Sequence, residues 1–260
     1  MRTWLRGFLA RARAPRGLRW DPSLEQETGA GVRLGLVDSG VRWAHPVFAG
    51  ARLRGRDFTG SSGLGDASGH GTASASLLVG QGGGWLRGLC PDSELLFAKA
   101  LGLREREASV EAIARAIRWL VGQGAQLVVL PFGSCRGAPL ITRELRRAVE
   151  RGCRVLAAAG NRGPDVLAFP ARLPEVLAVT GLGPDGAPLP FCCARDEVAL
   201  QAPGHEVPTV GAHGPATLSG SSPAAVLAAG VMALYLSRHR AAPRAGGPFS
   251  FTEGCHAHLP

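Results

Sequence analysis

Hydrophobic positions along the chain fall into short blocks with two different spacings. In the first kind, apolar residues recur at helical spacing, which predicts helices over 110–121 and 140–151. Short, nearly continuous apolar runs predict buried strands at 32–37, 94–100, 126–130, 154–159, 176–180 and 197–201. Strands that alternate with helices form a parallel sheet covered on both faces. The pattern therefore predicts an α/β fold, a three-layer αβα sandwich around a mostly parallel central sheet.

Two further segments begin with a polar residue and continue with small apolar ones. A Gly/Ser-rich loop leads into His70 and the run 73–79, which predicts a helix with His70 at its mouth. The stretch 218–236 opens with a Gly-Ser-Ser turn and predicts a buried helix, with Ser222 as N-cap and Pro223 at the first helical position. Taken singly, a capping serine or a histidine at a loop–helix junction has an ordinary structural interpretation.

Composition narrows the class of protein. The chain has 260 residues, 45% hydrophobic and 19% charged, which fits one large globular domain or, as the alternative, two small ones. The net charge of +9 is almost wholly arginine, because Lys99 is the only lysine. No basic cluster carries interleaved aromatic residues, which argues against a nucleic-acid partner. No apolar stretch reaches the length of a membrane span, apart from a near miss after Ser222, so we expect no stable membrane insertion.

The two ends differ in composition from the middle. Residues 1–28 form a basic leader that we expect to be poorly ordered, and its apolar part is too short, and interrupted by Arg6, for a secretory signal. We therefore expect a cytoplasmic protein, with export by a non-standard route as the alternative. The leader could also anchor the chain to a membrane surface or an acidic partner. The tail 241–260 is rich in Gly and Pro, which leaves 29–240 as the predicted domain.

Cysteine and glycine patterns predict no cofactor. The six cysteines follow no C-x-x-C spacing, and Cys153 lies in a strand pattern typical of a reduced core residue. Cys255, His256 and His258 could ligate a metal only with a partner cluster, and none is evident, so we predict no metal site. The run 82–84 is all glycine but lacks the lysine and Ser/Thr of a phosphate loop, which leaves a nucleotide-binding interpretation weak.

Asp38 directly follows the predicted strand 32–37, so Asp38, His70 and Ser222 stand in the chain order Asp, His, Ser, which is the order of the subtilisins. Four local blocks surround them and a nearby asparagine: Gly35-Leu-Val-Asp38-Ser-Gly, Gly69-His-Gly-Thr72, Ala157-Ala-Ala-Gly-Asn161 and Gly220-Ser-Ser-Pro-Ala224. These blocks resemble those of the subtilisin-like serine peptidases, family S8, and the resemblance covers about Val32 to His239. It implies a subtilisin-like fold and a serine endopeptidase that hydrolyses peptide or protein substrates through an acyl-enzyme.

The resemblance also implies a role for each matching residue. Ser222 would be the nucleophile and His70 the base that takes its proton. Asp38 would orient the imidazole and stabilise its cationic form. The Asn161 side chain and the Ser222 backbone N–H would bind the oxyanion of the tetrahedral intermediate. Ser221 is the competing nucleophile, and we prefer Ser222 because it matches the third position of the family's Gly-Thr-Ser block.

The same resemblance suggests a pocket for the side chain that precedes the scissile bond. It places Arg162 and Ala168 on one side, and Pro131, Phe132 and Gly133 on the opposite wall. An arginine at the mouth attracts acidic side chains and repels basic ones, so we expect cleavage after Leu, Met or Glu in preference to Lys or Arg. In the alternative, Arg162 points into solvent and the pocket simply favours apolar residues.

The chain departs from the family pattern at three places. Ser221 stands where threonine is usual, Val226 where proline is usual, and Ala73 where a second histidine is usual. None of these changes removes a triad group. A catalytically silent subtilase fold used for binding is the alternative function, but such a module has no reason to need the complete set of catalytic residues. The oligomeric state does not follow from the sequence.

Overall fold

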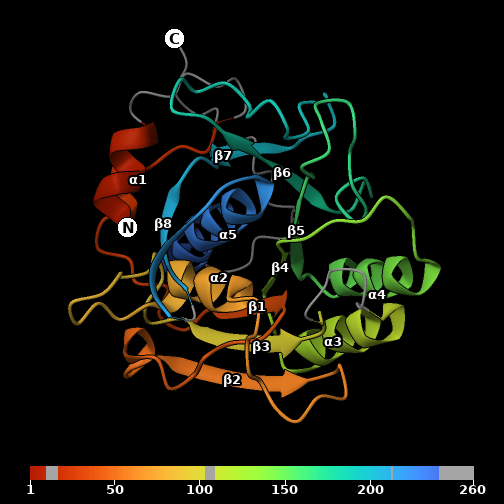
Figure 1. The fold of residues 1–260 in the computed structure, drawn as a ribbon, viewed down its shortest axis with the longest axis horizontal. Coiled ribbons are helices and arrows are strands. Elements are labelled where there is room, and N and C mark those ends of the chain that lie inside the picture. Colours follow the sequence, from red (N-terminus) through yellow and green to blue (C-terminus); the bar gives the residue numbers. More distant parts are fainter. Residues whose placement is uncertain (10–16, 103–108, 212, 240–260) are drawn as a thin grey trace.

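A seven-stranded sheet forms the centre of the molecule (Figure 1). The computed structural model describes residues 1–9, 17–102, 109–211 and 213–239. The strand order is β2-β3-β1-β4-β5-β6-β7, and each hydrogen-bonded pair of neighbours is parallel. The strands are β1 (Arg33–Asp38), β2 (Arg52–Asp57), β3 (Glu94–Lys99), β4 (Leu127–Leu130), β5 (Arg154–Ala158), β6 (Leu177–Leu182) and β7 (Leu200–Pro203). The predicted α/β class is confirmed, and each predicted strand is present with ends shifted by no more than three residues.

Helices cover both faces of this sheet, so the sandwich has three layers. On one face lie α2 (His70–Val79) and α5 (Ser221–Arg238), and on the other α3 (Val110–Gly122) and α4 (Pro139–Glu150). The strands alternate between the two cores: Leu34 and Leu36 pack with α2 and α5, whereas Val37 packs with α3. Outside these layers lie the hairpin β8 (Val207–Gly211) and β9 (Gly214–Leu218), the short 3-10 helices η1 (Pro22–Leu24) and η2 (Pro46–Phe48), and an N-terminal helix described below.

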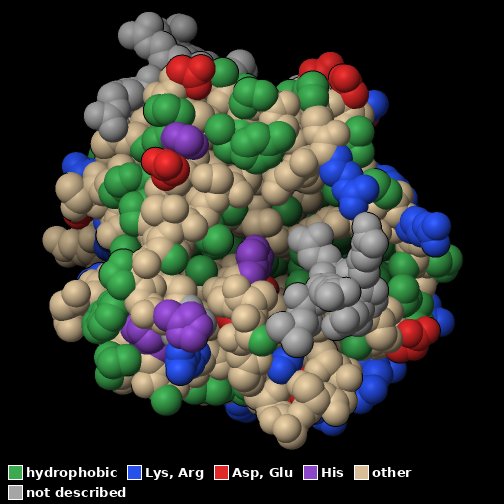
Figure 2. All heavy atoms as spheres, viewed as in Figure 1, with side chains coloured by type: hydrophobic (Ala, Val, Ile, Leu, Met, Phe, Trp, Pro, Cys, Tyr) green, Lys and Arg blue, Asp and Glu red, His purple; other side chains and the backbone are tan. Residues whose placement is uncertain are grey.

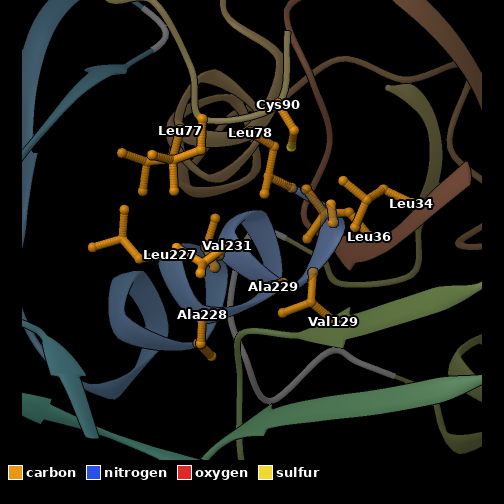
Figure 3. Packing of buried hydrophobic residues seen from close by; sticks show 14 of the residues in the cluster. Leu34, Leu36, Leu77, Leu78, Cys90, Val129, Leu227, Ala228, Ala229 and Val231 are labelled. Carbon is orange, nitrogen blue, oxygen red and sulfur yellow. The ribbon is translucent and has the colours of Figure 1, made fainter. Parts of the chain in front are cut away.

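The helices α2 and α5 are buried almost all round, as the small-residue runs predict. Leu77 and Leu78 of α2 face Leu227 and Val231 of α5, next to Leu36 of β1 (Figure 3). A helix that is apolar on every side belongs in the interior of a protein, because water on any face would meet hydrocarbon. Within the described ranges, no helix is long and apolar enough to cross a membrane, and the apolar stretch after Ser222 is the core helix α5.

The start of α5 differs from the prediction. The helix begins at Ser221, its N-cap is Gly220, and no side chain caps it, so the predicted N-cap role of Ser222 is wrong. Gly220 has φ 123° and ψ −166°, a backbone region open essentially to glycine alone. Its N–H donates to the Gly204 carbonyl at 2.7 Å, which fixes the helix start against the end of β7. Pro223 lies in the first turn, where a missing N–H leaves no intrahelical bond unmade.

The expectation of a poorly ordered leader is wrong for residues 1–9. They include α1 (Arg2–Leu9), whose Leu5 is fully buried and whose Phe8 is 8% exposed. The Arg2 guanidinium donates to the carbonyl oxygens of Leu89, Glu25 and Glu27. Burial of one apolar helix face and these bonds hold the leader on the core. Residues 10–16 of the leader and 240–260 of the tail, with Cys255, His256 and His258, lie outside the described residues.

Both α3 and α4 carry arginines, and on the face shown in Figure 2 more blue side chains lie on the right, the side of these helices in Figure 1, than on the left. Several of them surround one buried acid between the two helices. The Glu144 side chain is 2% exposed and accepts hydrogen bonds from Arg118 of α3 at 2.9 and 3.1 Å, and from Arg143 and Arg147 of its own helix. The Arg118 hydrogen bonds hold the pKa of Glu144 below its ordinary value. A buried carboxylate thus joins the two helices of this face.

Candidate active site

The carboxyl ends of three neighbouring strands bring the predicted site residues to one edge of the sheet. Asp38 is the last residue of β1, and the chain leaves β4 at Pro131 and β5 at Ala159. Since β1, β4 and β5 are adjacent and parallel, these three ends lie side by side. Such an edge is where open α/β sheets place their ligands and catalytic groups.

Asp38 and His70 form a hydrogen-bonded pair at this edge. The His70 Nδ1 atom lies 2.8 Å from Oδ1 and 3.0 Å from Oδ2 of Asp38. The Asp38 carboxylate is fully buried, whereas the His70 side chain is 31% exposed. Gly71 allows the approach, because a Cβ there would stand 2.1 Å from the Gly40 carbonyl oxygen. The carboxylate therefore orients the imidazole, with the Nε2 side of the ring turned away from Asp38.

Asn161 is fixed to the start of α5 through its carbonyl oxygen. The Ser221 backbone N–H and hydroxyl both donate to the Asn161 Oδ1 atom at 2.9 Å. A backbone N–H can only donate, so the amide atom that faces it must be the oxygen. The Nδ2 group is thus free of these two bonds, and it lies against Gly220, where an added Cβ would stand 2.6 Å from it. Asn161 is otherwise exposed.

The two serines of the Gly-Ser-Ser turn have different surroundings. Ser221 is fully buried, and its hydroxyl accepts from the Gly160 N–H at 3.1 Å while it donates to Asn161. Ser222 is half-buried and lines a pocket of about 180 Å³. The Ser221 hydroxyl is thus committed to the protein interior, and Ser222 is the serine that a substrate can reach.

That pocket includes most of the residues predicted to bind substrate. It is lined by Phe132, Gly133, Ser134, Cys135, Ala158, Gly160, Asn161, Arg162, Val166, Ala168, Ser221 and Ser222. Gly133 and Gly160 of this lining both lie close to Ala168. A Cβ on Gly133 would stand 2.6 Å from the Ala168 methyl group, and a Cβ on Gly160 would stand 3.0 Å from it, so larger residues at either position would fill this space. Pro131, predicted to be part of the opposite wall, is buried and is not among the residues that line this pocket. Arg162 is exposed at this pocket.

Comparison with known proteins identifies the family. Residues 29–246 match the Subtilase family, peptidase S8. The chain belongs to the subtilase family. It is 28% identical over 221 residues to the major intracellular serine protease of Bacillus subtilis (strain 168), covering 80% of this chain and 69% of that protein. It is 28% identical over 239 residues to thermitase of Thermoactinomyces vulgaris, covering 90% of this chain and 85% of thermitase.

A solved structure agrees with the sequence relatives. The prenylagaramide maturation protease PagA superposes with a TM-score of 0.75 at 29% identity, covering 84% of this chain and 79% of PagA. The subtilisin-like fold predicted from the four sequence blocks is confirmed, and so is the enzyme class of subtilisin-like serine endopeptidase.

Sequence reasoning missed Asp66, which ties together the aspartate and histidine blocks of this subtilase. Its Oδ1 atom accepts from the Ser39 hydroxyl at 2.9 Å and the Gly69 N–H at 3.0 Å, and its Oδ2 atom accepts from the Thr72 N–H and hydroxyl at 2.8 and 2.6 Å. The Ser39 hydroxyl in turn accepts from the Gly71 N–H at 3.2 Å. An aspartate just before a helix start is a recognisable capping signal, and it could have been found in the sequence.

Sequence reasoning also missed Cys192, a second partner of Asn161. The Cys192 thiol lies 3.3 Å from the Asn161 Oδ1 atom and is fully buried. Cys192 lies between β6 and β7, 31 residues from Asn161 along the chain. No local pattern links the two residues, so this contact becomes visible only in the fold.

Proposed function

We propose that this subtilase hydrolyses peptide bonds through Asp38, His70 and Ser222, with Ser222 as the nucleophile. The observation that carries the proposal is the hydrogen bond between His70 Nδ1 and the buried Asp38 carboxylate. With Nδ1 donating its proton to Asp38, the neutral ring presents the Nε2 lone pair as a base. His70 then takes the Ser222 proton as the hydroxyl attacks, and returns it to the leaving amine as the peptide C–N bond breaks. Water hydrolyses the resulting acyl-enzyme by the same route.

The oxyanion of the tetrahedral intermediate is bound by Asn161 Nδ2 and the Ser222 backbone N–H. Two features support this assignment. The Asn161 carbonyl oxygen is held by Ser221, which leaves Nδ2 for the pocket. Ser222 lies in the first turn of α5, where backbone N–H groups have no intrahelical partner and the helix dipole favours negative charge. Loss of one oxyanion donor lowers turnover by about 10²–10³.

Separate alanine substitutions of the two serines test the nucleophile. Ser222→Ala removes the attacking hydroxyl, so peptide cleavage should fall to background while the urea unfolding midpoint stays near that of the wild type. Ser221→Ala removes one donor to Asn161 but not the nucleophile, so cleavage should be slower and measurable. Cleavage that survives Ser222→Ala and is abolished by Ser221→Ala would overturn the assignment. A folded wild type without any cleavage or covalent labelling would favour a silent binding protein instead.

The substrate is a peptide or protein, and we propose that Arg162 tunes the residue accepted before the scissile bond. Arg162 is exposed and lines the same pocket as Ser222, so its positive charge favours an acidic or apolar side chain over a basic one. Solvent screening limits the preference to about 1 kcal/mol, or about fivefold. Arg162→Glu should reverse the Glu-to-Lys ratio in a peptide library. Arg151→Glu, an exposed arginine at the end of α4, is the control that changes net charge equally and should leave the ratio unchanged.

A further inference from the structure

We propose that Cys192 is a positioning residue for the oxyanion donor, holding the Asn161 amide with its carbonyl oxygen inward and its Nδ2 group toward the pocket. The inference rests on the proposed function, because it assigns Asn161 to the oxyanion. Cys192 does not touch substrate in this proposal and acts only through Asn161.

The direction of the contact follows from the chemistry of the two groups. The Asn161 Oδ1 atom, identified as oxygen by the Ser221 N–H, can only accept, so the Cys192 thiol at 3.3 Å is the donor. Burial raises the pKa of the Cys192 thiol to about 11. The sulfur therefore keeps its proton across the neutral range and remains a donor there.

The backbone fixes where this thiol sits relative to Asn161. The segment that carries Cys192 is joined to the loop after β5 by hydrogen bonds on both sides. The Gly163 N–H donates to Phe191 O at 2.9 Å, and the Cys193 N–H donates to Gly160 O at 3.1 Å. The Ala194 N–H donates to Pro164 O at 2.8 Å. The thiol and the amide thus belong to two paired segments.

A third donor matters because Asn161 is exposed and its amide torsion is soft. The terminal torsion of asparagine has broad minima, so bonds to Oδ1 determine where Nδ2 points. Ser221 supplies two of these bonds from the start of α5, and Cys192 supplies the third from a different segment. Removing the thiol should let the amide rotate away from the geometry that binds the oxyanion.

The effect should be on kcat, because the oxyanion forms only after the substrate is bound. Cys192→Ala should lower kcat about three- to tenfold, the size of one modest hydrogen bond, with KM nearly unchanged. Cys192→Ser keeps a donor and should recover most of kcat. The matched control is Cys193→Ala: Cys193 is the adjacent residue, it is equally buried, and its side chain belongs to the hydrophobic core on the α3 and α4 side of the sheet. That variant should lose stability but not kcat.

A double-mutant cycle separates positioning from a general packing role. In the Asn161→Ala background there is no amide to position, so adding Cys192→Ala should lower kcat no further. An equal loss in both backgrounds, an equal loss in Cys193→Ala, or an unchanged kcat in Cys192→Ala would overturn the proposal. Failure of the proposed function itself would be seen separately, as cleavage that survives Ser222→Ala.

Discussion

Gly220→Ala is the substitution whose consequences the structure specifies most fully. Glycine at this N-cap has φ 123° and ψ −166°, and another residue there costs about 1–3 kcal/mol in backbone strain. The added Cβ would stand 2.6 Å from Nδ2 and 3.0 Å from Oδ1 of Asn161, so the Asn161 side chain must move. Its movement breaks the bonds from Ser221 and Cys192, at about 1 kcal/mol each. We expect a total destabilisation of about 4–6 kcal/mol, the sum of this strain and the three lost bonds.

The same displacement removes an oxyanion donor, so kcat should fall about 10²–10³-fold and approach that of Asn161→Ala. Urea unfolding and steady-state peptide cleavage measure the two effects on one preparation. Gly152→Ala is the control, since Gly152 has φ 79° between α4 and β5 and open space where the Cβ would lie. The Gly152→Ala variant should be destabilised by about 1 kcal/mol, with kcat unchanged. A Gly220→Ala enzyme with wild-type kcat would refute the reasoning.

Three further results follow from the structure. Glu144→Gln should lower the free energy of unfolding by about 1–2 kcal/mol at pH 7. Arg118 depresses the pKa of Glu144 in the folded state, so the wild type keeps its full gain in stability over Glu144→Gln above the ordinary glutamate pKa of about 4.3. The urea unfolding midpoints of the two proteins should converge as the pH falls through the depressed pKa. Of the five described cysteines, only Cys135 is exposed, so peptide mapping after thiol labelling of the native protein at pH 8 should find it modified and Cys90, whose pKa burial raises to about 12, unmodified. Asp38→Asn should keep the fold by circular dichroism and lower kcat about 10⁴-fold, and a wild-type rate in that variant would exclude the triad.

Local apolar patterns predicted six of the seven strands of the parallel sheet and the four helices that cover it. They missed β2, because its arginines Arg52, Arg54 and Arg56 alternate with half-buried positions and the strand lies at the sheet edge. They also missed α1, whose order depends on a buried face and on Arg2 bonds to the carbonyls of other segments. In both cases the deciding contacts are made by tertiary packing, which overrides local composition.

The site residues likewise divide into those that local sequence predicted and those whose contacts depend on the fold. The four sequence blocks predicted the Asp38–His70 contact and the pocket with Ser222, because each block is continuous in the chain. The N-cap of α5 was mispredicted because the helix starts one residue earlier, after Gly220, whose N–H is bound by the Gly204 carbonyl at the end of β7. The contact of Cys192 with Asn161 was missed for the same reason, since it joins two segments that only the fold brings together.

Mapping a fluorophosphonate adduct on the wild-type chain tests the central claim most directly. The reagent bonds covalently to an activated serine hydroxyl, and tandem mass spectrometry of the peptide that contains α5 locates it to one residue. Because Ser222 lines the pocket and the buried Asp38 holds His70, we expect a single adduct on Ser222. This adduct should be lost in Asp38→Asn. An adduct on Ser221, or a folded enzyme that cleaves peptides without any adduct on α5, would contradict the account.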